Sequence, residues 1–214
     1  MNKYILVIVS LLFAFATKAE IFKSNNDTVR TEDVSGSFIK ESFVIVGYQN
    51  LRSTHIDHFT GFNMMVGHYF TPKFSLGIGF EDTYGQHHDD NGWILSEIRL
   101  IPIIVNARFL FGKNKLVTPF IELSTGITFL KYYKKVKVPP GSPDITETEG
   151  EYTFGPPFLV EEKGWYTYAG GGVYFRIYKH FMPFIGIGFK GYNMSTNVYA
   201  VNPRGLNFEI GCKF

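Results

Sequence analysis

The C-terminal segment of the chain alternates between apolar and polar or small residues, and this pattern strongly limits what it can fold into. Between 206 and 214 the apolar positions are Leu206, Phe208, Ile210, Cys212 and Phe214. Successive side chains of a β-strand point to opposite faces, so the segment predicts a strand with one apolar and one polar face. The same pattern recurs along the chain and favours a closed barrel with lipid outside and polar groups inside.

Eight segments have this strand character. They lie near 38–51, 59–70, 74–84, 93–111, 118–134, 165–178, 182–196 and 205–214. Each contains about the ten residues, or somewhat more, that a tilted strand needs to cross a bilayer. The content of 22 Phe, 13 Tyr and 22 Gly also suits many strands better than helices.

The connections between these segments alternate between short and long. Short turns are expected at 71–73, 112–115 and 179–181, and longer loops near 52–58, 85–92, 136–164 and 197–204. Transmembrane barrels have short periplasmic turns and long outer loops, and an even strand number returns both termini to the periplasm. The predicted fold is therefore all-β, an eight-stranded antiparallel up-and-down transmembrane β-barrel over 37–214, with a long outer loop near 136–164.

The N-terminus indicates export. Residues 1–19 have the features of a signal peptide, because Lys3 precedes a short apolar run over 5–16 and small residues follow it. That run is too short for a membrane-spanning helix, which is the alternative interpretation. Residues 20–36 are polar and are expected to form a periplasmic lead-in. The single cysteine, Cys212, excludes an intramolecular disulfide and is expected to be inert on the apolar face.

The alternation places one set of charged residues in the lumen of the predicted barrel. In the third predicted strand, for example, Leu76 and Ile78 face lipid while Gly77, Gly79 and Glu81 face inward. The inward charges are Glu81, Arg108, Glu122, Arg176, Lys190, Glu209 and Lys213. We expect them to pair across neighbouring strands, Glu122 with Arg108 and Glu209 with Arg176 or Lys190, because unpaired buried charge is costly. A lumen of eight strands would then be filled by side chains.

The fourth predicted strand is less regular than the others. Pro102 cannot donate to a β-ladder, so we expect a bulge there, or a change of phase that lets both Arg99 and Arg108 face inward.

A soluble, lipocalin-like barrel is the structural alternative, with apolar residues inside. Two features favour the membrane: the inward charges, and aromatic residues at strand ends that are typical of interfacial girdles. These aromatic residues are Tyr69, Phe70, Phe74, Tyr84, Trp93, Tyr132, Tyr133, Trp165, Tyr166, Tyr178, Tyr199 and Phe214.

Three motifs carry a family resemblance: Gly67-His68-Tyr69-Phe70 with 74–79, Pro183-Phe184-Ile185-Gly186-Ile187-Gly188, and the terminal Cys212-Lys213-Phe214. In these motifs the chain resembles the small outer-membrane barrels that include OmpA-like transmembrane domains and OmpX. It is more similar still to the eight-stranded outer membrane β-barrel proteins of the Bacteroidota. The resemblance implies the outer membrane of a Gram-negative bacterium, and implies that Phe214 is part of the signal read by the barrel-assembly machinery. We expect the chain to lack the periplasmic peptidoglycan-binding domain that full OmpA-type proteins carry.

Candidate chemistry is confined to the outer loops. His55 and His58 fall in the first loop, and His87, His88 and Asp89 in the second, so they could meet around a divalent cation at one rim. The alternative is that they are ordinary solvated loop residues. No serine motif accompanies these histidines, so an enzyme, such as one that modifies lipid, is not the expected function, and no cofactor is expected.

The expected function is structural or adhesive, and a narrow small-solute channel is the alternative. The proline- and glutamate-rich loop over 136–164 is the segment expected to meet a surface ligand, or to remain a solvated loop. Outer-membrane lipid and lipopolysaccharide are the other expected partners, with Lys131, Lys134, Lys135 and Lys137 near lipid phosphates. A net charge of only +2 argues against nucleic acid.

Overall fold

The structure is a computed structural model, and it describes residues 42–53, 58–85, 88–90, 92–112, 116–138, 147–149, 152–177, 181–194 and 202–214. The expected signal peptide and periplasmic lead-in lie outside the described residues. All described residues belong to one compact unit, Phe38–Phe214. Among them, no helix is long and apolar enough to cross a membrane.

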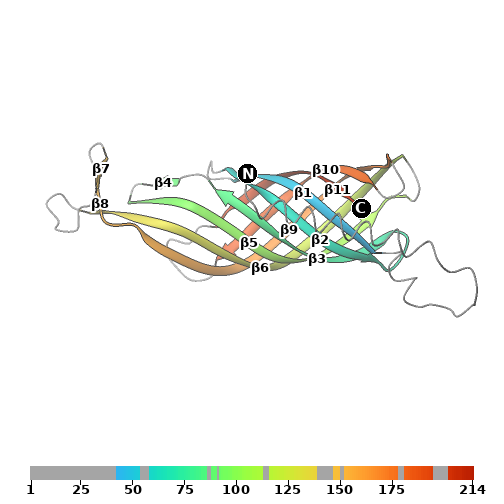
Figure 1. Ribbon diagram of the computed structural model, residues 1–214, viewed down its shortest axis with the longest axis horizontal. Coiled ribbons are helices and arrows are strands. Elements are labelled where there is room, and N and C mark those ends of the chain that lie inside the picture. The colour runs from blue at the N-terminus through green and yellow to red at the C-terminus, as the bar shows by residue number, and fades with distance from the viewer. Residues whose placement is uncertain are drawn as a thin grey trace, which may run out of the picture. The chain divides into compact units, whose positions relative to one another are not determined.

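Within the described residues, eight antiparallel strands pair into a closed ring. In ring order they are β1 (Ser42–Ser53), β2 (His58–Tyr69), β3 (Phe74–Gly85), β5 (Trp93–Leu110), β6 (Val117–Val138), β9 (Phe158–Phe175), β10 (Met182–Met194) and β11 (Arg204–Lys213). Pairing of β1 with β11 and of β5 with β6 leaves no open edge in this ring. Figure 1 shows the tilted strands of the barrel wall. The predicted eight-stranded antiparallel barrel is confirmed.

One end of the barrel carries the short turn between β2 and β3 and the C-terminus. In that turn the Thr71 hydroxyl accepts hydrogen bonds from the backbone N–H groups of Lys73 and Phe74, at 3.3 and 2.9 Å. At the C-terminus, Phe214 exchanges backbone hydrogen bonds with Val44 at 3.1 and 2.8 Å. We call this end the turn end.

At the opposite end, β5, β6 and β9 continue past the other strands of the ring. β6 has 22 residues and β5 and β9 have 18 each, whereas the other five strands of the ring have between 10 and 13. Three short strands, β4 (His88–Asp90), β7 (Glu147–Glu149) and β8 (Tyr152–Phe154), add to this part. β4 pairs with β5, and β8 joins β6 to β7 (Figure 1). We call this continuation the strand extension.

The expected long loop at 136–164 differs from the structure, in which strands occupy much of this segment. Residues up to Val138 belong to β6, β9 begins at Phe158, and β7 and β8 lie between them. The prolines and glutamates of the segment suggested a loop. The pairing of Lys131–Lys134 with 158–161, however, continues the β6–β9 ladder without interruption.

The outer wall of the barrel is apolar over a continuous belt. Ile78 exposes 68% of its surface and Leu123 64%, and both alternate with buried residues along their strands. Further exposed residues of the belt are Val66, Leu76, Ile103, Val105, Ile121, Ile127, Trp165, Ile185, Ile187, Phe189, Leu206, Phe208 and Ile210. Cys212 lies at the same parity in β11 and is a free thiol of intermediate exposure. Exposed apolar surface on this scale calls for a lipid environment.

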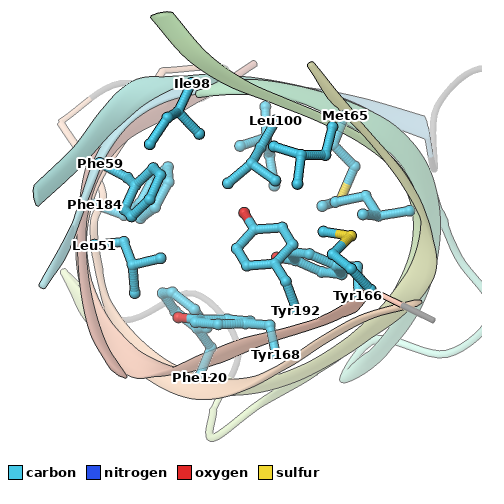
Figure 2. Close-up of a cluster of buried hydrophobic side chains, with 14 of the residues drawn as sticks. Leu51, Phe59, Met65, Ile98, Leu100, Phe120, Tyr166, Tyr168, Phe184 and Tyr192 are labelled. Carbon is cyan, nitrogen blue, oxygen red and sulfur yellow. The ribbon is translucent and has the colours of Figure 1, made fainter. Parts of the chain in front are cut away.

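The interior contains more apolar side chains than the sequence pattern suggested. Figure 2 shows Leu51, Phe59, Leu100, Phe120 and Phe184 pointing into the ring from different strands. Leu51, Phe59, Ile98, Leu100 and Leu130 fill the part towards the strand extension, and each is no more than 1% exposed. Phe43, Ile45, Phe120 and Phe184 pack towards the turn end. Polar side chains occupy the region between these two groups.

A bulge interrupts β5, but not at the expected proline. The β5–β6 register shifts between Ser96 and Arg99, and Glu97 between them has φ of 54°. Pro102 stays in register with Thr128. Beyond the bulge, even-numbered residues of β5 face inward, so Arg108 enters the lumen while Arg99 lies on the outer side. There Arg99 binds Asp82 at 2.7 Å.

The aromatic girdle is only partly as expected. Phe70, Tyr84, Tyr133, Trp165 and Phe214 are exposed. Tyr132 and Tyr166 are buried, and Tyr69 contacts the buried Lys213, because their parity along the strand turns them inward. Tyr178 and Tyr199 are not among the described residues.

Candidate functional site

The interior polar residues form two hydrogen-bonded clusters in the barrel lumen. One cluster brings together β3 and β10, which lie on opposite sides of the ring, and the other joins the consecutive strands β5, β6 and β9. The residues that form the hydrogen bonds lie at the inward positions of their strands, because successive side chains of a β-strand point to opposite faces.

The first cluster is centred on Glu81 of β3, whose side chain is buried together with that of Lys190 of β10. The Lys190 ammonium donates to Glu81 at 2.9 Å and also to the Gln49 side-chain oxygen. The Gln49 amide donates to Glu81 at 2.8 Å, and the Tyr166 hydroxyl donates to Glu81 at 2.7 Å. We call this set, completed by Thr83 and Tyr192, the Glu81 cluster.

The second cluster is centred on Arg108 of β5 and Glu122 of β6, which are directly opposite in the ladder. The Arg108 guanidinium donates twice to Glu122 Oε2, once at 3.1 Å, and once to the Tyr174 hydroxyl. Its carbon lies 4.7 Å from the centre of the Phe120 ring, in a cation–π position. The Asn106 amide donates to the same carboxylate at 2.9 Å and to Ser124 at 2.8 Å. We call this set the Arg108 cluster.

The remaining inward charges lie in different surroundings. Glu209 of β11 accepts a hydrogen bond from the Asn63 amide at 2.7 Å. The expected pairing of Glu209 with Lys190 is wrong, because Lys190 reaches across the lumen to Glu81. Lys213 contacts the Tyr69 hydroxyl near the turn end and lies 5.0 Å from the centre of the Phe43 ring. Arg176 follows the last residue of β9, and its backbone N–H donates to Leu116.

A small cavity lies between the two clusters, with a volume of about 20 Å³. Its lining includes Asn63, Glu122, Tyr168, Asn207 and Glu209. The cavity is large enough for a single water-sized particle. Buried polar atoms on its wall have no hydrogen-bond partner, and they are Asn63 Oδ1, Glu122 Oε1, the Tyr168 hydroxyl and both polar atoms of Asn207.

The histidine site expected at the outer rim can be placed only in part. His55 and His87 lie outside the described residues, and nothing is described of the side chains of His88 and Asp89. His58 begins β2 and is exposed. Among the described residues, no group of three or more His, Cys, Asp and Glu is arranged to hold a metal ion.

Sequence reasoning identified the charged residues of the lumen but not their neutral partners. Gln49, Asn63, Asn106, Tyr166 and Asn207 have the inward parity of their strands, so strand alternation could have found them. Their contacts depend on neighbouring strands, and hydrogen bonds such as Tyr166 to Glu81, 85 positions apart, cannot be read from one strand.

The closed ring, the apolar belt and the buried charges together define the class of protein. A barrel with an even number of antiparallel strands, an apolar outer wall and a polar interior is a transmembrane β-barrel of the bacterial outer-membrane type. A soluble barrel would bury the belt and expose the charges. The chain is thus an integral barrel of the Gram-negative outer membrane, as its wall and interior indicate.

Comparisons with known proteins yield structures rather than a family. No protein-family model matches the chain, and no curated protein matches it. Neisserial surface protein A is 11% identical, with a TM-score of 0.45 over 80% of this chain and 92% of that one. The Ail protein of Yersinia pestis is 12% identical, with a TM-score of 0.44 over 81% and 97%. The N-terminal barrel of OprF from Pseudomonas aeruginosa is 12% identical, with a TM-score of 0.41 over 80% and 97%.

With TM-scores below 0.5, these similarities are too weak to add to what the strand pairing of this chain establishes by itself. They carry no statement about its ligands or partners.

Proposed function

We propose that this chain is a non-conducting outer-membrane barrel with a structural role, and that its strand extension interacts with a surface. The filled lumen carries the first part of this proposal. Two apolar groups and two hydrogen-bonded clusters occupy the interior, and the cavity between them holds only about 20 Å³. An eight-stranded barrel encloses little more than its own side chains, so no continuous water path is expected.

The strand extension supports the surface role. A tilted strand of about ten residues crosses the bilayer, so β6 has roughly 12 surplus residues, which extend roughly 40 Å along the strand at about 3.3 Å per residue. Exposed apolar side chains persist there, among them Tyr133, which pairs with Leu159, and Phe158. Unlike the belt, these residues lie beyond the lipid, where exposed apolar groups favour contact with other surfaces.

The lipid partners follow from the outer wall. The apolar belt takes lipid chains. Just above it, Arg99, Lys131 and Lys163 occupy outward positions on β5, β6 and β9, with Arg99 opposite Lys131. Arg99 and Lys131 already pair with Asp82 and Glu161, so Lys163 is the cation of this set that best suits the phosphate groups of lipopolysaccharide. Phe214, exposed and 5.7 Å from the Phe181 ring, is the residue we assign to recognition by the barrel-assembly machinery.

Conductance in planar lipid bilayers tests the non-conducting role. The refolded barrel is expected to give no stable single-channel current. Heat-modifiable mobility on gels verifies that the inserted protein is folded. Stable single-channel steps from folded protein would establish the channel alternative instead.

Attachment of cells to uncoated polystyrene tests the surface role. The double variant Tyr133→Ser/Leu159→Ser is expected to lower attachment at least twofold at equal surface expression. The control is Ile187→Val, which alters a belt residue that lipid covers and should leave attachment unchanged. Equal attachment by the wild type and the double variant would remove the surface role while leaving the structural one.

A further inference from the structure

The central cavity is unusual because several buried polar atoms of its lining residues have no hydrogen-bond partner. Buried polar atoms in proteins almost always have hydrogen-bond partners, and those that do not usually face a water or an ion. Here five unpaired atoms belong to four residues from four different strands that line one cavity, Asn63, Glu122, Tyr168 and Asn207. Each of these four residues is at least nine-tenths buried, and Asn207 is only 1% exposed.

In Glu122 one carboxylate oxygen is hydrogen-bonded and the other is not. Its Oε2 atom receives the hydrogen bonds from Arg108 and Asn106, while Oε1 receives none and belongs to a residue that lines the cavity. Asn63 has the same arrangement, because its amide nitrogen donates to Glu209 and its oxygen has no partner. The unpaired atoms are therefore mostly oxygens, left over after each residue has used its other polar atom.

The charges around the cavity do not balance. Its lining contains three carboxylates, Glu81, Glu122 and Glu209, and two cations, Arg108 and Lys190. Lys213 is four residues beyond Glu209 in β11, roughly 13 Å along the strand, and binds Tyr69 near the turn end. With all five groups ionised, the cavity wall carries one excess negative charge, and excess charge in a low dielectric is costly unless it is compensated.

We propose that the central cavity binds one monovalent metal cation of the sodium or potassium class. Oxygen ligands suit hard cations, and Asn63 Oδ1, Glu122 Oε1, the Tyr168 hydroxyl and Asn207 Oδ1 supply four. One positive charge balances the lining. Mg²⁺ keeps several waters and would not fit in about 20 Å³. A single water donates only two hydrogen bonds, one fewer than the three pure acceptors require, and would leave the charge uncompensated.

Thallium provides a direct test, because Tl⁺ replaces these ions and scatters anomalously. Crystals of the full barrel grown in detergent and soaked in a thallium salt are expected to show an anomalous peak in the cavity, in contact with Glu122 and Asn207. The peak should be absent from Asn207→Leu. Density filled by water, with no anomalous peak in the wild type, would overturn the proposal.

A solution experiment tests the same site without crystals. Thermal unfolding of the detergent-solubilised wild type in sodium chloride is expected to occur about 5 °C higher than in choline chloride of equal ionic strength. Asn207→Leu and Glu209→Gln should each lose this shift. Glu161→Gln removes a carboxylate from an exposed ion pair outside the cavity and should keep it.

The wild type alone decides this experiment if a cavity variant fails to fold. Equal midpoints of the wild type in lithium, sodium, potassium and choline chlorides would exclude a bound metal cation.

Discussion

At the residue scale, the Arg108–Glu122 pair shows how the barrel interior depends on its buried ion pairs. Both side chains are only 2% exposed. Removing one member of a buried ion pair leaves the other charge without compensation, which is far more costly than the pair itself is stabilising. Exposed pairs behave differently: Lys131 and Glu161 expose more than half of their side chains, and water screens them.

Glu122→Gln is therefore expected to lower the free energy of unfolding by about 3–5 kcal/mol. Glu161→Gln, the matched change in the exposed pair, should cost less than about 1 kcal/mol. Urea unfolding in lipid vesicles, followed by tryptophan fluorescence, measures both. Similar costs for the two variants would contradict the buried pairing described here.

Two inward glycines differ in the space around them. A Cβ atom on Gly47 would lie 2.7 Å from Asn63 Oδ1 and 2.8 Å from Glu209 Oε1, two side chains held by a hydrogen bond to each other. At Gly186 the nearest atom would be 3.6 Å away. The lumen is thus closely packed at Gly47 and looser at Gly186.

Gly47→Ala should consequently destabilise the barrel by about 1–3 kcal/mol, the usual cost of overpacking. Gly186→Ala is expected to be neutral or slightly stabilising, because alanine restricts the unfolded chain more than glycine does. The two midpoints of urea unfolding provide the comparison, and a reversed order would show that the packing over Gly47 is wrong.

At the element scale, the bulge in β5 separates two phases of the strand. Glu97, at φ of 54°, has a left-handed backbone that non-glycine residues adopt at a cost. Before the bulge both Ile94 and Leu95 are buried, and after it the even-numbered residues are buried. The bulge thereby allows β5 to pair with both β3 and the long β6 while turning Arg99 outward.

Glycine at the bulge should relieve this cost. Glu97→Gly is expected to stabilise the barrel by about 0.5–1 kcal/mol. Glu161→Gly, in the regular part of β9, should destabilise it by a similar amount. Equilibrium unfolding of the two variants checks the difference in sign, and loss of stability in Glu97→Gly would argue against the left-handed conformation.

At the scale of the whole molecule, the position of the bilayer is the dominant constraint. The belt residue Leu123 is exposed to lipid, whereas Leu159 lies in the strand extension and is also exposed, at 50%. A charge placed at mid-bilayer must leave water, while one beyond the membrane does not. The same substitution at the two positions therefore reports the location of the membrane.

Leu123→Arg is expected to cost about 2–4 kcal/mol in lipid vesicles, and Leu159→Arg about 0–1 kcal/mol. Reversible unfolding in urea measures both values. If Leu123→Arg were as mild as Leu159→Arg, the belt would face water, and the barrel would not span a membrane.

Local pattern in the sequence determined the strand number, the antiparallel order and the parity of the faces, because a strand's period of two is visible in a single segment. That period alone assigns Glu81 and Ile78 to opposite faces of β3, and Phe208 and Glu209 to opposite faces of β11. Only the closed ring decided which side chains meet across the lumen. Glu209 binds Asn63 rather than Lys190, because barrel closure and strand stagger bring distant residues together. The extension of β6 and β9 also depended on tertiary pairing, since its proline- and glutamate-rich segment has little strand signal until a neighbouring strand supplies its hydrogen bonds.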